Sequence, residues 1–175
     1  MGGSDKGLQR LHGKPLLQHV IERFAPQVDV LRINANHNAG AYATFGYPVI
    51  ADVMPGYAGP LAGVQAGLLN CTTPLLATVP CDSPFLPLDL VTRLRDALEA
   101  GQAELAVATT DGWTQHAFML CRREVLPSLD AFLASGERRI GRWYETLRVV
   151  EVPFADESAF ANINTLEELN HLENS

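Results

Sequence analysis

Positive charge is scarce in this sequence. Its 175 residues include 13 lysines and arginines against 20 aspartates and glutamates, which gives a formal net charge of −7 at pH 7. Broad binding to nucleic acid or to an anionic membrane requires a basic surface. The composition therefore argues against both kinds of partner, and a phosphate ligand would have to be attracted by a few local lysines and arginines.

Long apolar runs and paired cysteines are lacking as well. No run approaches the ~18 residues that a membrane-spanning helix needs. The three cysteines, Cys71, Cys81 and Cys121, are odd in number and do not have the spacing of a metal site. They are typical of reduced, mostly buried thiols, so we expect a cytoplasmic protein. The G-x-x-x-x-G-K-[ST] pattern of a P-loop is also missing.

What the sequence does contain is an alternation of helix-like and strand-like segments. This alternation predicts one domain with a three-layer α/β/α, Rossmann-like fold, in which helices cover both faces of a mostly parallel sheet. Helices are expected at residues 14–24, 39–45, 60–69, 88–100, 123–133, 139–144 and 165–172, and strands at residues 28–36, 48–51, 75–79, 104–109, 117–121 and 147–152. The strands at 104–109 and 117–121 are expected to pair antiparallel, because their connection is too short for a crossover helix.

One carboxylate stands where a predicted buried strand ends. The string Pro80-Cys81-Asp82-Ser83-Pro84 follows the apolar run 75–79. Ligands of open α/β sheets bind at the carboxyl ends of the strands, and Mg²⁺ is commonly held by one or two carboxylates plus substrate phosphates. Asp82 is therefore a candidate Mg²⁺ ligand. The alternative is an ordinary turn or a helix N-cap, and the motif alone does not decide between them.

Other polar groups can likewise be interpreted either as ligand-binding residues or as purely structural ones. The glycines around Lys6 would let backbone N–H groups approach a phosphate, with the lysine as a point charge, unless this segment is only a flexible terminus. Asn34 and Asp52 each follow a predicted strand and would bind a nucleoside, or would simply shape turns. The glycine-rich segment 56–67 leads into a helix whose N-terminus favours an anion.

A local basic cluster stands out in this acidic chain. Arg138, Arg139 and Arg142 lie on or beside one predicted helix. Arginine forks match phosphate oxygens, so the cluster suits a second anionic substrate. The alternative is a solvated basic helix face.

Eight short strings occur in a characteristic order: GGSDKG from residue 2, then 13–16, 34–36, Asp52, 59–63, 80–84, 136–139 and 162–165. Over nearly its whole length the sequence resembles the molybdenum cofactor guanylyltransferases, the MobA-type nucleotidyltransferases. The resemblance implies transfer of GMP from GTP to the phosphate of molybdopterin, with release of pyrophosphate. The alternatives are a related cytidylyl- or sugar-phosphate nucleotidyltransferase and a non-catalytic cofactor-binding or delivery module.

The resemblance also implies roles for residues. Mg²⁺ would be the cofactor, with GTP and molybdopterin as substrates, and molybdenum-insertion and molybdoenzyme chaperone proteins as partners. Asp82 and Asn164, or less favourably Asn162, would hold the metal. His116, Trp113 and Trp143 are weaker candidates for the pterin side. The residues expected to bind substrate or metal are Lys6, Asn34, Asp52, Gly59, Gly63, Asp82, Arg138, Arg139, Asn162 and Asn164, with Lys6 and Asp82 as the catalytic pair.

The start of the sequence departs from the family pattern. The family begins with a strand that ends in Leu-Ala-Gly-Gly and a basic loop that ends in Arg-Met-Gly-Gly, whereas this sequence begins at that methionine. Neighbours of an omitted central strand would expose unpaired edges. We therefore expect the single domain 1–175 to lack its N-terminal strand and glycine loop.

Overall fold

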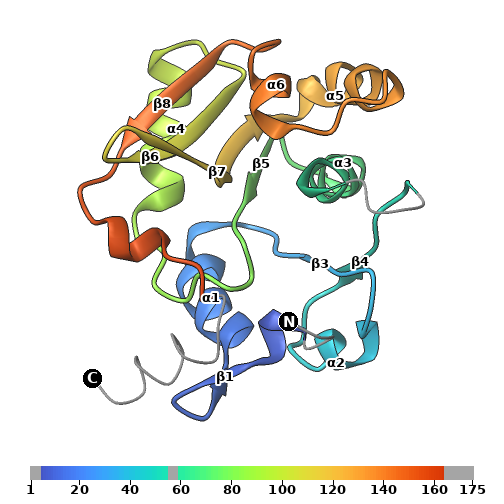
Figure 1. Cartoon of the computed structure of the whole chain (residues 1–175), viewed down its shortest axis with the longest axis vertical. Coiled ribbons are helices and arrows are strands. Elements are labelled where there is room, and N and C mark those ends of the chain that lie inside the picture. Colours follow the sequence, from blue (N-terminus) through green and yellow to red (C-terminus); the bar gives the residue numbers. More distant parts are fainter. Residues whose placement is uncertain (1–4, 55–58, 164–175) are drawn as a thin grey trace.

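A four-stranded sheet forms the centre of the protein, in the order β5-β7-β6-β8 (Figure 1). The computed structural model describes residues 5–54 and 59–163. The strands of this sheet are β5 (Leu75–Thr78), β6 (Leu105–Thr110), β7 (Trp113–Arg122) and β8 (Val149–Pro153). β7 pairs antiparallel with both β5 and β6, and β6 pairs parallel with β8.

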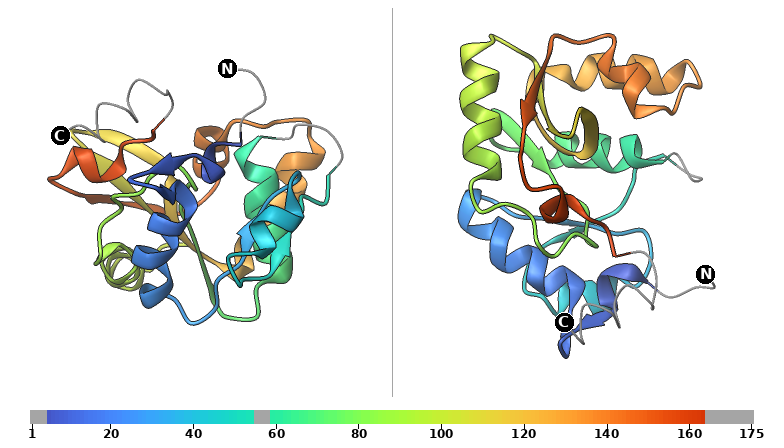
Figure 2. Two further views of the ribbon diagram at one scale, coloured as in Figure 1. Left: turned by 90° about the horizontal axis from the view of Figure 1, so that it is seen from below. Right: turned by 60° about the vertical axis from the view of Figure 1, so that its left-hand side comes forward.

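Helices cover both faces of this sheet, as two views at different angles show (Figure 2). One face packs against α4 (Leu90–Ala100), in a core that α1 (Leu16–Phe24) joins through Val20 and Phe24. The other face packs against α3 (Pro60–Asn70), α5 (Leu126–Ala134) and α6 (Ile140–Tyr144). The residues of β6 explain why both faces are covered. All of them are buried, and successive side chains point to opposite faces of the sheet. Ala106 and Ala108 contribute to the first core, and Leu105 and Val107 to the second.

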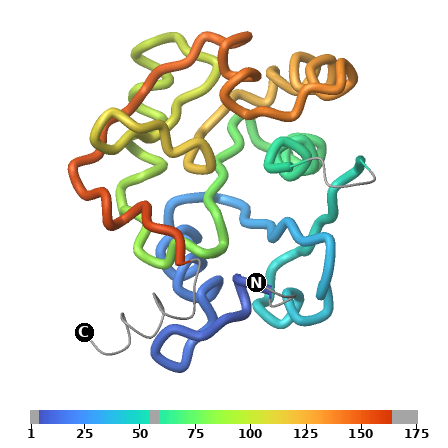
Figure 3. The backbone as a smooth tube through the Cα atoms, in the orientation of Figure 1, coloured from blue at the N-terminus to red at the C-terminus, as the bar shows by residue number. Residues whose placement is uncertain are grey.

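Two smaller sheets lie beside the central one. β3 (Ile33–Asn34) pairs parallel with β4 (Val49–Ile50), and β1 (Arg10–Leu11) pairs antiparallel with β2 (Lys14–Pro15). Between β3 and β4 the chain forms α2 (Ala39–Ala43). The path of the chain in Figure 3 shows this unit apart from the central sheet. The remaining elements are short 3-10 turns: η1 (Lys6–Leu8), η2 (Ala25–Gln27), η3 (Arg123–Val125) and η4 (Glu157–Phe160).

The predicted α/β class is confirmed, and so is the antiparallel pair formed by β6 and β7. The pairings are mixed, however, rather than mostly parallel. Within the described ranges, β5 pairs with β7 on one side and with no strand on the other, and β3 likewise pairs only with β4. The expectation that the domain lacks its N-terminal strand and glycine loop stays a prediction.

Several boundaries differ from expectation. The strand predicted at 28–36 pairs only at Ile33–Asn34, because no described strand lies beside its first half. The polar stretch 111–115 was expected to be a connection, but β7 already begins at Trp113, and the turn consists of Asp111 and Gly112 with φ of 46° and 79°. The helix expected at 165–172 lies outside the described residues. No helix in the described part of the chain is long and apolar enough to cross a membrane.

Candidate functional site

Asp82 lies where the sequence predicted, in the turn that follows β5. Its side chain is only 10% exposed, although it carries a charge. The Lys6 ammonium, whose side chain is 42% exposed, lies 3.4 Å from Asp82 Oδ2. The other oxygen, Oδ1, accepts no hydrogen bond from the described residues. The structure thus brings the two predicted catalytic residues together across 76 positions of sequence.

A third segment joins this pair from the far end of the chain. The Ser83 hydroxyl donates to Asn162 Oδ1 at 2.6 Å, and the backbone N–H of Ile163 donates to the Asp82 carbonyl at 2.9 Å. Ser83 is fully buried, so its hydroxyl needs this partner. Asn162 is therefore adjacent to Asp82 in space, with its amide oxygen turned to Ser83. Asn164, the preferred second metal ligand, lies outside the described residues.

The predicted nucleoside residues form a second cluster. Parallel strands end at the same edge of a sheet, so the ends of β3 and β4 bring Asn34 and Asp52 together. Asn34 Nδ2 donates to Asp52 Oδ1 at 3.1 Å, and Asn36 Nδ2 donates to Oδ2 at 2.8 Å. Asn36 Oδ1 in turn accepts from the backbone N–H of Asp52 at 2.9 Å. The carboxylate is held by two amides but remains partly exposed, so it can accept further donors.

Gly63 completes this cluster from α3. A Cβ at this position would stand 2.6 Å from Asn34 Oδ1, which is closer than atoms can approach. The absence of a side chain at Gly63 therefore lets Asn34 lie against the first turns of the helix. Gly59 precedes the helix with φ of 72°, a conformation that favours glycine. The structure thus places both predicted glycines at the N-terminal end of α3, with Gly63 directly against Asn34.

The segment that carries Lys6 is bound to α2. The Tyr42 hydroxyl donates to Asp5 Oδ1, and Asn38 Nδ2 donates to Asp5 Oδ2 at 3.2 Å. On the other side of Lys6, a Cβ on Gly7 would stand 2.9 Å from the Tyr42 hydroxyl oxygen and 3.4 Å from Cys81 Sγ. Burial raises the pKa of the Cys81 thiol to about 11, and the Asp82 carboxylate adds to the rise. Cys81 is therefore a neutral packing group at neutral pH.

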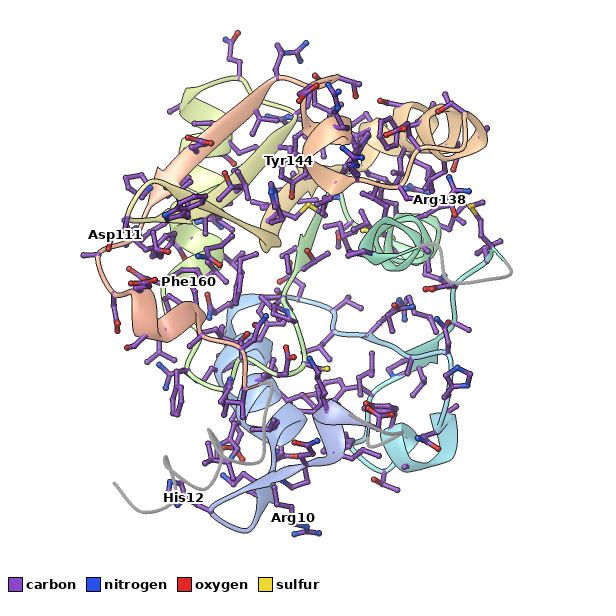
Figure 4. The ribbon with its side chains drawn as sticks, viewed as in Figure 1. Arg10, His12, Asp111, Arg138, Tyr144 and Phe160 are labelled. Atoms are coloured by element: carbon purple, nitrogen blue, oxygen red, sulfur yellow. The ribbon has the colours of Figure 1, made fainter. Side chains whose placement is uncertain are left out.

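The arginines divide into different roles. Arg138 Nη1 donates to the carbonyls of Leu133 and Glu137 at 2.7 and 2.6 Å, so it closes the end of α5. Arg142 forms an ion pair with Glu145 at 3.0 Å. Arg139 is exposed and lines a shallow hollow together with Arg142, Phe132 and Glu137. Figure 4 places Arg138 on the side of the molecule that carries α3 and α5. No contact between described residues joins these arginines to Asp82.

The three weaker candidates for pterin binding differ in their surroundings. Trp143 is fully buried among α3, α5 and the sheet, so its ring is unavailable for stacking on a ligand. Trp113 is 76% exposed and begins β7 directly after the hairpin turn, whose Asp111 is labelled in Figure 4. The His116 ring packs edge-on against Tyr144, and the Tyr144 hydroxyl donates to the His116 carbonyl at 2.8 Å. His116 therefore lies against α6, the helix that follows Arg139.

The described residues offer a metal ion few protein ligands. Within residues 5–54 and 59–163, no three histidines, cysteines, aspartates or glutamates gather as a metal site. Asp82 fits the other way in which Mg²⁺ is bound, since its Oδ1 accepts no hydrogen bond from residues 5–54 or 59–163. Mg²⁺ usually keeps waters and takes its further ligands from substrate phosphates.

Sequence reasoning missed four polar residues of these groups: Asp5, Asn36, Asn38 and Ser83. One signal was present for two of them, because asparagine recurs at alternate positions 34, 36 and 38. All three side chains donate to carboxylates, two to Asp52 and one to Asp5. The other two residues flank Lys6 and Asp82, but their partners are too distant in sequence to be inferred.

Residues 1–150 match the family described as the MobA-like NTP transferase domain. The chain belongs to this family. It is 55% identical to the molybdenum cofactor guanylyltransferase of Cupriavidus taiwanensis over 97% of this chain and 87% of that protein. It is 49% identical to the molybdenum cofactor guanylyltransferase of Bordetella pertussis, over 99% of this chain and 90% of the relative.

Solved structures show the same fold in more distant proteins. Molybdopterin-guanine dinucleotide biosynthesis protein A of Archaeoglobus fulgidus matches with a TM-score of 0.80 at 23% identity, over 98% of this chain and 90% of that one. The 2-C-methyl-D-erythritol 4-phosphate cytidylyltransferase of Thermus thermophilus matches with a TM-score of 0.74 at 15% identity, over 97% and 92%. At these identities the likeness concerns the fold alone.

Proposed function

We propose that this member of the MobA-like NTP transferase family transfers GMP from GTP to the phosphate of molybdopterin and releases pyrophosphate. The observation that carries the chemistry is the Lys6–Asp82 pair, a cation and a nearly buried carboxylate 3.4 Å apart at the carboxyl end of β5. The substrates are inferred from relatives that are 45–55% identical to the chain and are named molybdenum cofactor guanylyltransferase.

The reaction needs no strong general base. An oxygen of the molybdopterin phosphate attacks the α-phosphorus of GTP, and a new P–O bond forms in line with the bond that breaks. The bond between the α-phosphorus and the bridging oxygen to the β-phosphorus breaks, and its electron pair leaves with pyrophosphate. Since a phosphate monoester is already an anion at neutral pH, the protein has mainly to position the two phosphates and balance their charge.

Lys6 and Asp82 divide this task. The Lys6 ammonium is a compact point charge suited to the leaving pyrophosphate. Asp82, with Asn164 as the second candidate, would hold Mg²⁺. When bound, Mg²⁺ would neutralise charge on the phosphates and help to align them. The loose 3.4 Å contact between Lys6 and Asp82 would then open as the ammonium turns to the phosphates.

The cluster at the ends of β3 and β4 would hold the nucleoside. Asp52 is a double acceptor fixed by Asn34 and Asn36, and a carboxylate in this state can accept from guanine N–H groups or from ribose hydroxyls. The N-terminus of α3 lies beside it through Gly63. Arg139, in its hollow with Phe132, would bind the phosphate of molybdopterin.

The alternatives receive less support. The likeness to a cytidylyltransferase is at 15% identity and concerns the fold, whereas relatives at 45–55% identity are guanylyltransferases by name. A binding module that only delivers the cofactor would not need a lysine and a carboxylate opposed at a strand end.

The deciding experiment measures pyrophosphate release with molybdopterin, Mg²⁺ and each of the four nucleoside triphosphates in turn. We expect release with GTP alone and none when Mg²⁺ is removed with EDTA. Release with CTP instead would support the cytidylyl alternative. Binding of GTP without any release would support the delivery module.

A further inference from the structure

Asp5, Asn38 and Tyr42 form a hydrogen-bonded group, here called the Asp5 clamp, that has no role so far in the proposed reaction. Tyr42 donates to one carboxylate oxygen of Asp5 and Asn38 to the other. Tyr42 is 4% exposed and its ring packs in a small core with Leu17, Ile21 and Ile33. A buried hydroxyl of this kind costs free energy without its partner, so the contact with Asp5 is well specified.

The Asp5 clamp contacts the residues on both sides of Lys6. Asp5 precedes Lys6 and carries the two hydrogen bonds, while Gly7 follows it and lies so close to the Tyr42 hydroxyl that a Cβ there would stand 2.9 Å away. Lys6 itself begins η1, a single 3-10 turn that is too short to be stable alone. The direction of the Lys6 side chain toward Asp82 therefore depends on α2.

Asn38 ties the clamp to the nucleoside cluster. It lies with Asn36 in the loop that follows Asn34, the last residue of β3, and it adopts φ of 53° and ψ of 30°, a left-handed conformation that is uncommon for residues other than glycine. Such strain persists where surrounding contacts hold it. One short stretch of chain thus binds Asp52 at one end and Asp5 at the other.

We propose that Tyr42 and Asn38 are positioning residues, which act through Asp5 to set the Lys6 ammonium against the β- and γ-phosphates of a bound nucleoside triphosphate. This inference rests on the proposed function, because it needs a triphosphate substrate. It makes a distinct claim: the clamp affects binding of the triphosphate end and leaves the nucleoside end unchanged.

The test compares Tyr42→Phe with Tyr47→Phe by calorimetric titration with GTP and with GMP in the presence of Mg²⁺. Tyr47 packs partly buried in the same core, and its hydroxyl forms no hydrogen bond with described residues, which makes it the matched control. We expect Tyr42→Phe to weaken GTP binding about tenfold, the weight of one good hydrogen bond, and to leave GMP binding within about twofold. Tyr47→Phe should change neither.

A double-mutant cycle shows whether Tyr42 acts through Lys6. In a Lys6→Ala background, Tyr42→Phe should cause no further loss of GTP binding. Equal losses for GTP and GMP, or additive losses in the cycle, would overturn the proposal. If Tyr42→Phe fails to fold, Asn38→Gly decides, since glycine tolerates the left-handed backbone and lacks the side chain that donates to Asp5. It should show the same selectivity for GTP over GMP.

The same titrations separate this inference from the proposed function. If the wild-type protein binds another nucleoside triphosphate in place of GTP, guanylyl transfer is refuted while the triphosphate-against-monophosphate comparison still decides the clamp. If it binds no triphosphate, both are refuted.

Discussion

The Ser83 hydroxyl donates a 2.6 Å hydrogen bond to the amide oxygen of Asn162, a residue 79 positions further along the chain. This contact and the bond from Ile163 N–H to the Asp82 carbonyl hold the end of the described chain against the turn that carries the candidate metal ligand. Ser83 has no exposed surface, so it has no water to replace Asn162 as partner.

Ser83→Ala should therefore lower the free energy of unfolding by about 0.5–1.5 kcal/mol, because it removes the hydrogen bond that joins this turn to Asn162. Urea denaturation measures this. Ser135→Ala is the control, since Ser135 is exposed and bonds only locally to the Phe132 carbonyl, and it should cost much less. Equal losses in the two variants would show that the Ser83–Asn162 bond is not specifically stabilising.

Asp82→Asn should abolish pyrophosphate release while leaving the fold intact. The substitution keeps the size of the side chain but removes the charge that would bind Mg²⁺ and attract Lys6. Turnover at saturating Mg²⁺ and the thermal unfolding midpoint are measured together. Asp96→Asn, at an exposed position on α4, is the matched control and should be silent. Retention of more than about a tenth of normal turnover would rule out a metal-binding role for Asp82.

The position of Asp82 was predictable and its surroundings were not. The apolar run 75–79 followed by prolines marks a strand that ends, and strand ends are where ligands bind in this fold class, so local pattern was enough. The partners of Asp82 are Lys6 and the backbone N–H of Ile163, and approaches between such distant positions depend on the tertiary fold. The suggestion that Trp143 stacks on a pterin was wrong for the same reason, because the burial of its ring against α3 and α5 results from tertiary packing.

The strand predicted at 28–36 shows the same limit for the fold. Its β-branched and apolar residues favour extended backbone, but a strand exists only where a neighbour supplies hydrogen bonds. β4 pairs with this segment only at Ile33 and Asn34, and the backbone N–H groups of Ile33 and Ala35 make the hydrogen bonds. The β6–β7 hairpin was predictable, since its short connection permits only antiparallel pairing.

Gly63→Ala should weaken GTP binding by about tenfold or more without lowering stability. Alanine is about 1 kcal/mol more favourable than glycine inside a helix, so the backbone of α3 gains. The new methyl group would stand 2.6 Å from Asn34 Oδ1 and force that side chain away from Asp52. Titration with GTP measures the effect. Gly67→Ala is the control, because its methyl group would meet the Leu76 side chain, at 3.0 Å, and no residue of the nucleoside cluster. Unchanged GTP affinity in Gly63→Ala would remove Asn34 from the nucleoside site.

Stability should fall steadily as the pH rises above about 9. Burial raises the pKa of the Cys81 thiol from 9.0 to about 11 and that of Cys121 from 9.0 to about 12. The folded chain thus keeps these protons more tightly than the unfolded chain. Their contribution is complete below the unfolded pKa and is lost as the pH rises toward 11–12, by up to about 1.4 kcal/mol per thiol per pH unit.

Urea midpoints at pH 8, 9 and 10 measure this dependence. Cys121→Ala removes one of the two thiols, so its midpoint should fall less steeply between pH 9 and 10 than that of the wild type. Parallel curves for the two proteins would show that Cys121 does not contribute to the alkaline loss.

The two neighbouring arginines should give opposite phenotypes. Arg138→Ala removes the guanidinium that closes the end of α5 at the Leu133 carbonyl, and should cost about 1.5–3 kcal/mol of stability, as hydrogen bonds from charged groups do. Arg139 is exposed in the hollow beside Phe132, so Arg139→Ala should leave the unfolding midpoint unchanged. It should instead raise the KM for molybdopterin about tenfold with an unchanged KM for GTP. Thermal unfolding and initial rates with each substrate varied in turn distinguish the two roles, and an Arg139→Ala variant with normal KM for both substrates would place the molybdopterin phosphate elsewhere.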